Sequence, residues 1–72
     1  MKITARLHDC SLDGETGYAA SCVEFPEANG QGESLDACLK DLRAAVNEIL
    51  TYRREEAEQS LIEGEHLEAL EA

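Results

Sequence analysis

The longest regular pattern in this sequence is an apolar stripe that begins at Leu35 and meets no helix breaker before Gly64. Its members are three and four positions apart, which is the spacing of one face of an α-helix. They are Leu35, Cys38, Leu39, Leu42, Ala45, Val46, Ile49 and Leu50. Ser34 is a suitable N-cap, and Asp36 places a negative charge in the first turn. The pattern therefore predicts one helix that runs from Ser34 to about Ser60.

The length of this helix constrains the rest of the fold. About 27 helical residues span about 40 Å, whereas a compact chain of this size is only about 30 Å across. A strand of about six residues covers about 20 Å, so the helix must extend beyond its sheet, break, or lie against another chain. Tyr52, Ala57 and Leu61 are the apolar residues of the extending part. We expect these three to be oligomer contacts in a homodimer or a higher homo-oligomer.

Two strands precede the helix. Residues 3–7 and residues 18–23 each alternate in the period-two pattern of a strand with one buried face. The segment between them, Asp9 to Gly17, contains Asp13-Gly14 and a second glycine, so it predicts a hairpin loop. The two strands are therefore expected to be antiparallel.

The segments on either side of the helix are harder to assign. Phe25-Pro26 ends the second strand, because proline has no N–H to donate to a β-ladder. Residues 28–32 form a candidate third strand, in which Gly30 and Gly32 suggest a bend or a bulge. After the helix, the Glu, Leu and Ala of residues 63–72 favour a helix or a frayed end by propensity. A final strand is the alternative, although its alternation is imperfect.

Composition limits the class of protein. Seventy-two residues make one domain with a marginal core, so we expect self-association to contribute to its stability. Cys10, Cys22 and Cys38 are odd in number, and the sequence shows neither a signal peptide nor a transmembrane run. We therefore expect reduced thiols, a cytoplasmic location and no membrane partner.

The net charge of −10 is concentrated near the end of the sequence. Residues 1–54 contain six Lys or Arg and nine Asp or Glu, a net of −3, whereas residues 55–72 contain seven Glu and no Lys or Arg, a net of −7. Such a surface repels phosphate backbones, so we expect no direct nucleic-acid binding. It attracts a basic protein and raises its association rate. The alternative is that the charge only keeps the domain soluble.

No residue pattern indicates catalysis or a cofactor. Asp9, Asp13, Glu24 and Asp36 are the carboxylates available to a metal-dependent nuclease. The loop position of Asp13 and the helix-start position of Asp36 instead predict surface and capping roles. The run His8-Asp9-Cys10 is not accompanied by the close Cys-x-x-Cys pairs of structural zinc sites. We therefore expect no enzyme, no metal site and no cofactor.

The segment from Tyr18 to Leu42 resembles the HicB family of small bacterial antitoxin domains. The usual pattern of that family opens with Gly-Tyr, continues through Glu-Leu-Pro, and ends with Gln-Gly, an acidic residue, Thr or Ser, and Leu at a helix start. The matching residues here are Gly17, Tyr18, Glu24, Phe25, Pro26, Gln31, Gly32 and Ser34. Val23 and the pair Glu27-Ala28 depart from the pattern at the turn. The chain looks like a compact form without the C-terminal DNA-binding domain that many HicB proteins carry.

The resemblance implies a single HicB-like domain over residues 1–72. Its fold would be of the α+β class, a small antiparallel β-sheet with one long packed helix in the order β-β-β-α-β, which is a partial ribonuclease-H-like fold. Residues 65–71 would then pair as the last strand. The implied function is that of a type II antitoxin, which binds and occludes a small basic ribonuclease toxin of the HicA type. The alternative is an orphan HicB-like domain, a dimeric structural or regulatory module without a toxin partner.

Overall fold

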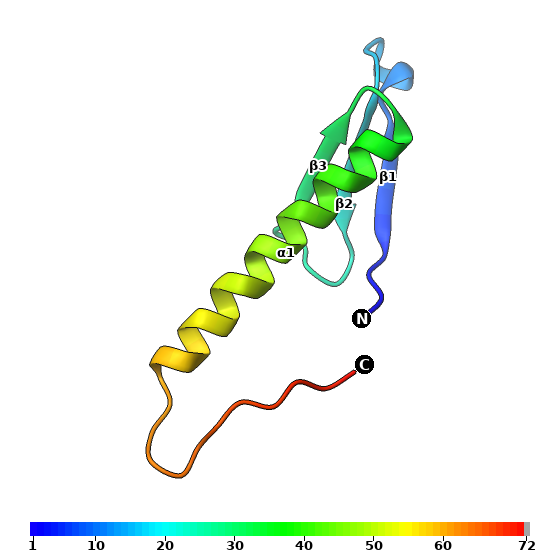
Figure 1. The fold of residues 1–72 in the computed structure, drawn as a ribbon. Coiled ribbons are helices and arrows are strands. Elements are labelled where there is room, and N and C mark those ends of the chain that lie inside the picture. Colours follow the sequence, from blue (N-terminus) through cyan, green and yellow to red (C-terminus); the bar gives the residue numbers. More distant parts are fainter. Residues whose placement is uncertain (72) are drawn as a thin grey trace.

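The computed structural model describes residues 1–71, whose elements follow the order β-β-β-α (Figure 1). Strand β1 covers Ala5–Asp9, β2 covers Tyr18–Cys22 and β3 covers Asn29–Gly32, while helix α1 covers Leu35–Gln59. A short 3-10 helix, η1, covers Cys10–Asp13. The predicted α+β class, with a small antiparallel sheet and one long helix, is confirmed.

The three strands form one antiparallel sheet in the order β1-β2-β3, so that β1 and β3 are its edges. Leu7, Ala20 and Gly30 lie side by side across the three strands. The predicted hairpin loop between β1 and β2 contains η1. The side chain of Asp9 caps this short helix by accepting a hydrogen bond of 3.0 Å from the N–H of Ser11.

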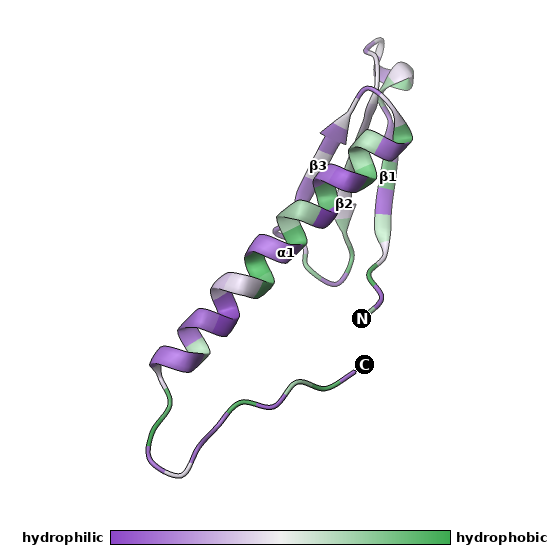
Figure 2. Cartoon of the chain, viewed as in Figure 1, coloured by the Kyte–Doolittle hydropathy of each residue, from purple (hydrophilic) through white to green (hydrophobic). Residues whose placement is uncertain are grey.

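Helix α1 covers one face of the sheet and packs over β2 and β3. The buried apolar residues come from β2, from the turn after it and from the helix. They are Ala20, Cys22, Phe25, Ala28, Cys38, Leu42 and Val46. Figure 2 shows that apolar residues are concentrated in the part of α1 that faces the sheet. Burial of Cys38, Leu42 and Val46 confirms the predicted apolar stripe.

Two glycines allow the helix backbone to lie directly on β3. A Cβ atom at Gly30 would be 2.6 Å from the backbone nitrogen of Leu42, and one at Gly32 would be 2.7 Å from the backbone nitrogen of Cys38. Both glycines pair in regular register with β2, so the predicted bend or bulge at these positions is wrong. The physical reason for the glycines is the close approach of helix and strand.

Helix α1 extends past the sheet, as its predicted length requires (Figure 1). Its 25 residues span about 38 Å at 1.5 Å per residue, and the molecule measures 56 × 20 × 16 Å. The N–H of Ser60 donates to the carbonyl oxygens of Glu56 and Ala57, which places the end of the helix where the sequence predicts it. Within residues 1–71, no helix combines the length and the hydropathy needed to cross a membrane.

The predicted last strand over residues 65–71 is wrong, because these residues form neither a strand nor a helix. Helix α1 continues to Gln59, so the chain reverses direction beyond the end of the sheet, at a turn in residues 62–65. The following residues run back toward the N-terminus (Figure 1). Glu71 reaches the amino group of Met1, at 3.6 Å. Residues 65–71 therefore run back alongside the protruding part of α1 and do not pair with β1.

Candidate functional site

Several residues that carry the family resemblance build the turn after β2 and the start of α1. Phe25 is buried, and its carbonyl oxygen accepts a hydrogen bond of 2.9 Å from the N–H of Ala28, which closes a turn that contains Pro26. Ser34 caps α1, since its Oγ accepts a hydrogen bond of 3.1 Å from the N–H of Ala37. These residues fix the path of the chain between the sheet and the helix.

Four further residues of the resemblance join the strands to each other and to the helix. Gly17 has a φ of +89°, and a Cβ atom there would be 2.6 Å from the carbonyl oxygen of Gly32. Tyr18 lies opposite Gly32 in the sheet and packs against the core. The N–H of Gln31 donates to Oδ2 of Asp41, on α1, at 3.0 Å. This hydrogen bond connects the outer edge of β3 to the helix.

Glu24 ties the end of β2 to the segment that precedes β1. Its Oε1 accepts a hydrogen bond of 2.6 Å from the N–H of Thr4, and its Oε2 accepts one of 2.8 Å from the hydroxyl of Thr4. The thiol of Cys22 also donates to Oε1, at 3.5 Å. The hydrogen bonds from Thr4, its backbone N–H first, lower the pKa of Glu24 to about 2. Glu24 is therefore an ionised structural carboxylate at neutral pH.

The other candidate carboxylates serve local structure. Asp9 caps η1, and the hydrogen bonds from Ser11 lower its pKa. Oδ2 of Asp13 lies 2.6 Å from Nε2 of His8, and this hydrogen bond raises the pKa of His8. Asp36 lies in the first turn of α1, where its charge favours the helix. In the part of the chain that the structure describes, no three His, Cys, Asp or Glu side chains are grouped to hold a metal ion.

The three cysteines are free thiols in different environments. Cys22 and Cys38 are buried in the core, which agrees with their predicted positions on the apolar faces of a strand and the helix. Cys10 is half-buried in η1, and burial raises the pKa of its thiol. The thiol of Cys10 is therefore protonated at neutral pH, and a protonated thiol is a poor nucleophile and a poor metal ligand.

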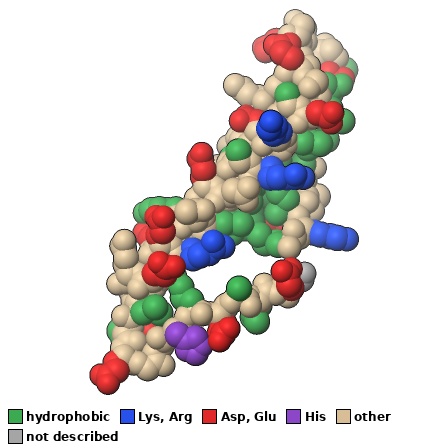
Figure 3. Space-filling model, viewed as in Figure 1, with side chains coloured by type: hydrophobic (Ala, Val, Ile, Leu, Met, Phe, Trp, Pro, Cys, Tyr) green, Lys and Arg blue, Asp and Glu red, His purple; other side chains and the backbone are tan. Residues whose placement is uncertain are grey.

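The protruding end of α1 and the segment after it form an acidic hook, which we define as residues 55–71. The hook contains seven Glu and no Lys or Arg. Its acidic residues are Glu55, Glu56, Glu58, Glu63, Glu65, Glu68 and Glu71. Figure 3 shows acidic side chains spread around this end of the molecule. Gly64, with a φ of +90°, lies in the turn between the two arms of the hook.

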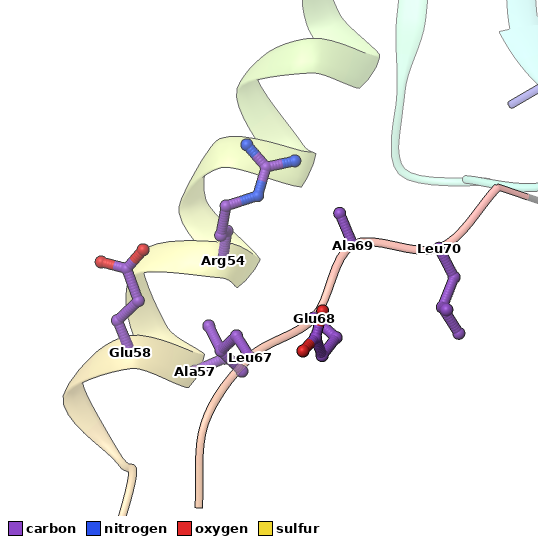
Figure 4. A pocket seen from close by; sticks show the side chains of 7 residues that line it. All are labelled: Arg54, Ala57, Glu58, Leu67, Glu68, Ala69 and Leu70. Atoms are coloured by element: carbon purple, nitrogen blue, oxygen red, sulfur yellow. The ribbon is translucent and has the colours of Figure 1, made fainter.

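A cleft of about 520 Å³ lies between the two arms (Figure 4). Its lining residues are Arg54, which immediately precedes the hook, Ala57 and Glu58 on the helical arm, and Leu67, Glu68, Ala69 and Leu70 on the returning arm. Leu67 is 45% exposed and Leu70 is 90% exposed, so the cleft presents apolar side chains next to carboxylates. Sequence analysis did not identify these two leucines, because their position across the cleft from the helical arm depends on the reversal of the chain.

The predicted oligomer contacts lie on the protruding helix and just after it. Tyr52 and Leu61 are both exposed, and Ala57 is half-buried because it lines the cleft. These side chains are accessible to a second chain, and their contact with one stays a prediction. Sequence analysis did not find the role of Arg53, whose guanidinium lies 5.4 Å from the centre of the Phe25 ring. No local pattern connects these two positions, which only the fold brings together.

The chain is similar to a protein from Synechocystis sp. (strain ATCC 27184 / PCC 6803 / Kazusa), which is named UPF0150 protein ssl0738. The two sequences are 38% identical over 47 residues, which cover 65% of this chain and 65% of that protein. The matched region thus spans just under two thirds of the relative. No family model matches the chain, and no solved structure matches it.

Proposed function

We propose that this protein is an antitoxin-like binding module that captures and occludes a small basic protein, of the kind represented by the HicA-type ribonuclease toxins. The observation that carries the proposal is the acidic hook, which combines seven Glu with a cleft at the protruding end of the molecule that is lined by both apolar and charged side chains. The resemblance of residues 18–42 to HicB domains supports the same class of function.

The chemistry of the hook suits a basic protein partner. Carboxylates spread around a protruding element attract a cationic partner from a distance and accelerate encounter. Exposed apolar side chains next to them, such as Leu67 and Leu70, provide the kind of anchor that is buried at the centre of protein interfaces. The glutamates would then form the polar rim around this anchor.

A binding role agrees with the local hydrogen bonds and ion pairs that the candidate carboxylates make outside the hook. Glu24 is held by Thr4, Asp9 caps η1, and Asp13 pairs with His8. These three candidate carboxylates are thus each engaged in a local contact. A general acid or base needs a pKa near the working pH, whereas the pKa of Glu24 is lowered to about 2.

Co-expression with the product of an adjacent basic reading frame tests the proposal. The tagged protein should retain the basic product in a pull-down and should suppress its toxicity to cells. A product that is neither bound nor rendered harmless contradicts the proposal.

Charge-matched variants locate the interaction. One variant replaces three glutamates of the hook, as Glu65→Gln, Glu68→Gln and Glu71→Gln. The control replaces three exposed glutamates elsewhere, as Glu15→Gln, Glu33→Gln and Glu48→Gln, so both variants lose the same charge. The hook variant should bind about 3- to 150-fold more weakly, since each of three exposed ion pairs contributes about 0.2–1 kcal/mol. The control should bind almost like the wild type. Equal losses in both variants would show that only net charge matters.

A dimeric structural or regulatory module without a toxin is the second candidate. The observation that favours it is the extended shape of the chain, with a radius of gyration of 15.9 Å, against about 11 Å for a compact domain of this length. A chain of this shape gains from a second copy that covers part of its surface. Stable self-association together with failure to bind any adjacent basic product would favour this candidate over the antitoxin.

A further inference from the structure

The outer edge of β1 has backbone groups that find no partner among the described residues. Thr4 accepts a hydrogen bond of 2.9 Å from the residue that follows β2, and Cys10 donates one of 3.1 Å to the residue that precedes β2. Residues of an antiparallel pair alternate between bonded and non-bonded positions. It follows from the register that Ala5, Leu7 and Asp9 direct their N–H and C=O groups away from β2. Within residues 1–71, no hydrogen bond from another element reaches the N–H groups of these three residues or the C=O groups of Ala5 and Leu7, while the C=O of Asp9 begins the first turn of η1.

The opposite edge of the sheet is partly closed. The outward N–H of Gln31 on β3 donates to the carboxylate of Asp41, which belongs to α1. The helix also lies directly over β3, because Gly30 and Gly32 permit the close approach. The edge of β1 has neither form of protection, and an open strand edge is a template for pairing with another strand.

The side chains of β1 add an apolar surface to this edge. Leu7 lies opposite the buried Ala20, so Leu7 points to the face of the sheet that carries α1. Leu7 is nevertheless 44% exposed, because the helix packs over β2 and β3. Ile3 and Ala5 lie on the same face and pack only partly against the core. The helix-side margin of the sheet is therefore an uncovered apolar strip next to free hydrogen-bonding groups.

The chain exposes more surface than a compact monomer does. Its accessible surface is 5899 Å², whereas a compact monomer of 7.9 kDa exposes about 4,400 Å². The excess of about 1,500 Å² is larger than the roughly 800 Å² that each partner buries in an interface of standard size. A second copy of the chain can therefore bury an interface of standard size on each protomer. The accessible surface that remains on each protomer would still be at least that of a compact monomer.

We propose that two copies of this chain associate through β1, with the two strands antiparallel and Leu7 opposite Leu7 of the second copy. This register uses the whole strand, since it places Ala5 opposite Asp9 in both directions. Each of the three outward residues then donates one hydrogen bond and accepts one. The two sheets become one continuous sheet of six strands, three from each copy, and the exposed Leu7 side chains meet at the two-fold axis.

The distribution of charge favours this surface over others for self-association. Residues 1–9 carry Lys2 and Arg6 against Asp9, a net charge of +1. Residues 10–72 therefore carry a net charge of −11, since the total is −10. Two acidic hooks, each with a net charge of −7, would repel each other far more strongly than two β1 segments, each with a net charge of +1. Antiparallel pairing also directs the two protruding helices to opposite ends of the dimer, because each extends past the start of its own β1 (Figure 1). Both hooks then remain free to bind a partner.

Amide hydrogen exchange on the wild-type chain tests the proposal directly. In the separate chain the amides of Leu7 and Asp9 have no acceptor among residues 1–71, so they should exchange rapidly at low protein concentration. Light scattering should give a mass of 15.8 kDa, twice 7.9 kDa, at high concentration. Under those conditions the exchange rates of these two amides should fall by a factor of about ten or more. The amides of Arg6 and His8 face β2 and provide the internal reference, since they are protected in both states. A monomer at every concentration overturns the proposal.

Two matched leucine substitutions identify the surface. Leu7→Lys places two ammonium groups at the proposed two-fold axis and should convert the dimer into a monomer of 7.9 kDa. Leu12→Lys makes the same chemical change at a leucine that is 83% exposed in η1, and it should leave the dimer intact. A dimer that persists in Leu7→Lys, or one that dissociates only in Leu61→Lys, overturns the proposal and assigns the contact to another surface. Because the inference uses only the sheet edge, a failed pull-down of a basic partner leaves it unaffected.

Discussion

Replacement of Gly30 by alanine should destabilise the fold through a single added methyl group. The new Cβ would lie 2.6 Å from the backbone nitrogen of Leu42, 2.8 Å from its Cα and 2.9 Å from the carbonyl oxygen of Cys38. Backbone atoms cannot rotate away as a side chain can. To restore an ordinary contact of 3.4 Å, helix and strand must separate by about 0.8 Å, which loosens the packing of α1 along β3.

The expected magnitude follows from the two opposing effects. Overpacking of a core costs about 1–3 kcal/mol, and the rigid backbone around Gly30 places this case near the upper end. Alanine also reduces the entropy of the unfolded chain, which stabilises the protein by about 0.4–1 kcal/mol. The net loss is about 2 kcal/mol, out of a total of about 4–11 kcal/mol expected for a domain of this length. The melting temperature should fall by about 8–16 °C.

Thermal unfolding followed by circular dichroism, at one fixed protein concentration, measures this change. The concentration must be constant because self-association shifts the apparent stability. Gln31→Ala is the matched control, since the exposed Gln31 is next to Gly30 and its substitution should change stability by no more than about 0.5 kcal/mol. Gly14→Ala adds a methyl group with no atom within 4 Å but at a φ of +79°, so it should show only a backbone cost of about 1–2 kcal/mol. Wild-type stability of Gly30→Ala would refute the close-approach argument.

Three further changes test individual contacts. The pKa of Glu24 is lowered from 4.5 to about 2, so its contribution to stability is present above pH 4.5 and lost as the pH falls toward 2; Glu24→Gln should reduce this acid dependence in urea unfolding. Asp13→Asn should lower the pKa of His8, which its hydrogen bond to Asp13 raises above 6.5, in a titration followed by NMR. The His8–Asp13 pair stabilises the fold below pH 6.5 and less as the pH rises through the raised pKa, so this stabilisation should disappear in the variant. Ser34→Ala removes the cap of α1 and should cost about 1 kcal/mol in the same unfolding assay, and an unchanged midpoint would contradict the capping role.

The acidic hook shows how far a candidate site can be predicted from sequence. The excess of glutamate in residues 55–72 is visible without a structure, and it already suggests a basic protein partner. The cleft is not visible in this way, because Leu67 and Leu70 line the same cleft as Ala57 only after the chain reverses. The reversal depends on where the helix ends relative to the sheet, and that is a tertiary property.

The residues that carry the family resemblance show a second limit of prediction from sequence. Their order along the chain suggested a particular family, but it did not reveal what each residue does. Glu24 proves to hold Thr4, and Gly32 proves to lie under the helix. Both roles require partners at least six positions away in sequence, at Thr4 and at Cys38. A local pattern therefore carries the family signal, whereas the physical reason for it is nonlocal.

The sequence by itself determined the elements whose causes are local. Alternation defined the strands, the apolar stripe and Ser34 defined the helix, and the fixed rise per residue required that helix to extend past its sheet. Only the tertiary structure decided the close contact at Gly30, the return of residues 65–71 to the N-terminus in place of a last strand, and the open edge of β1. These features depend on how elements lie relative to one another, because packing distances and unpaired backbone groups exist only once the elements have assembled.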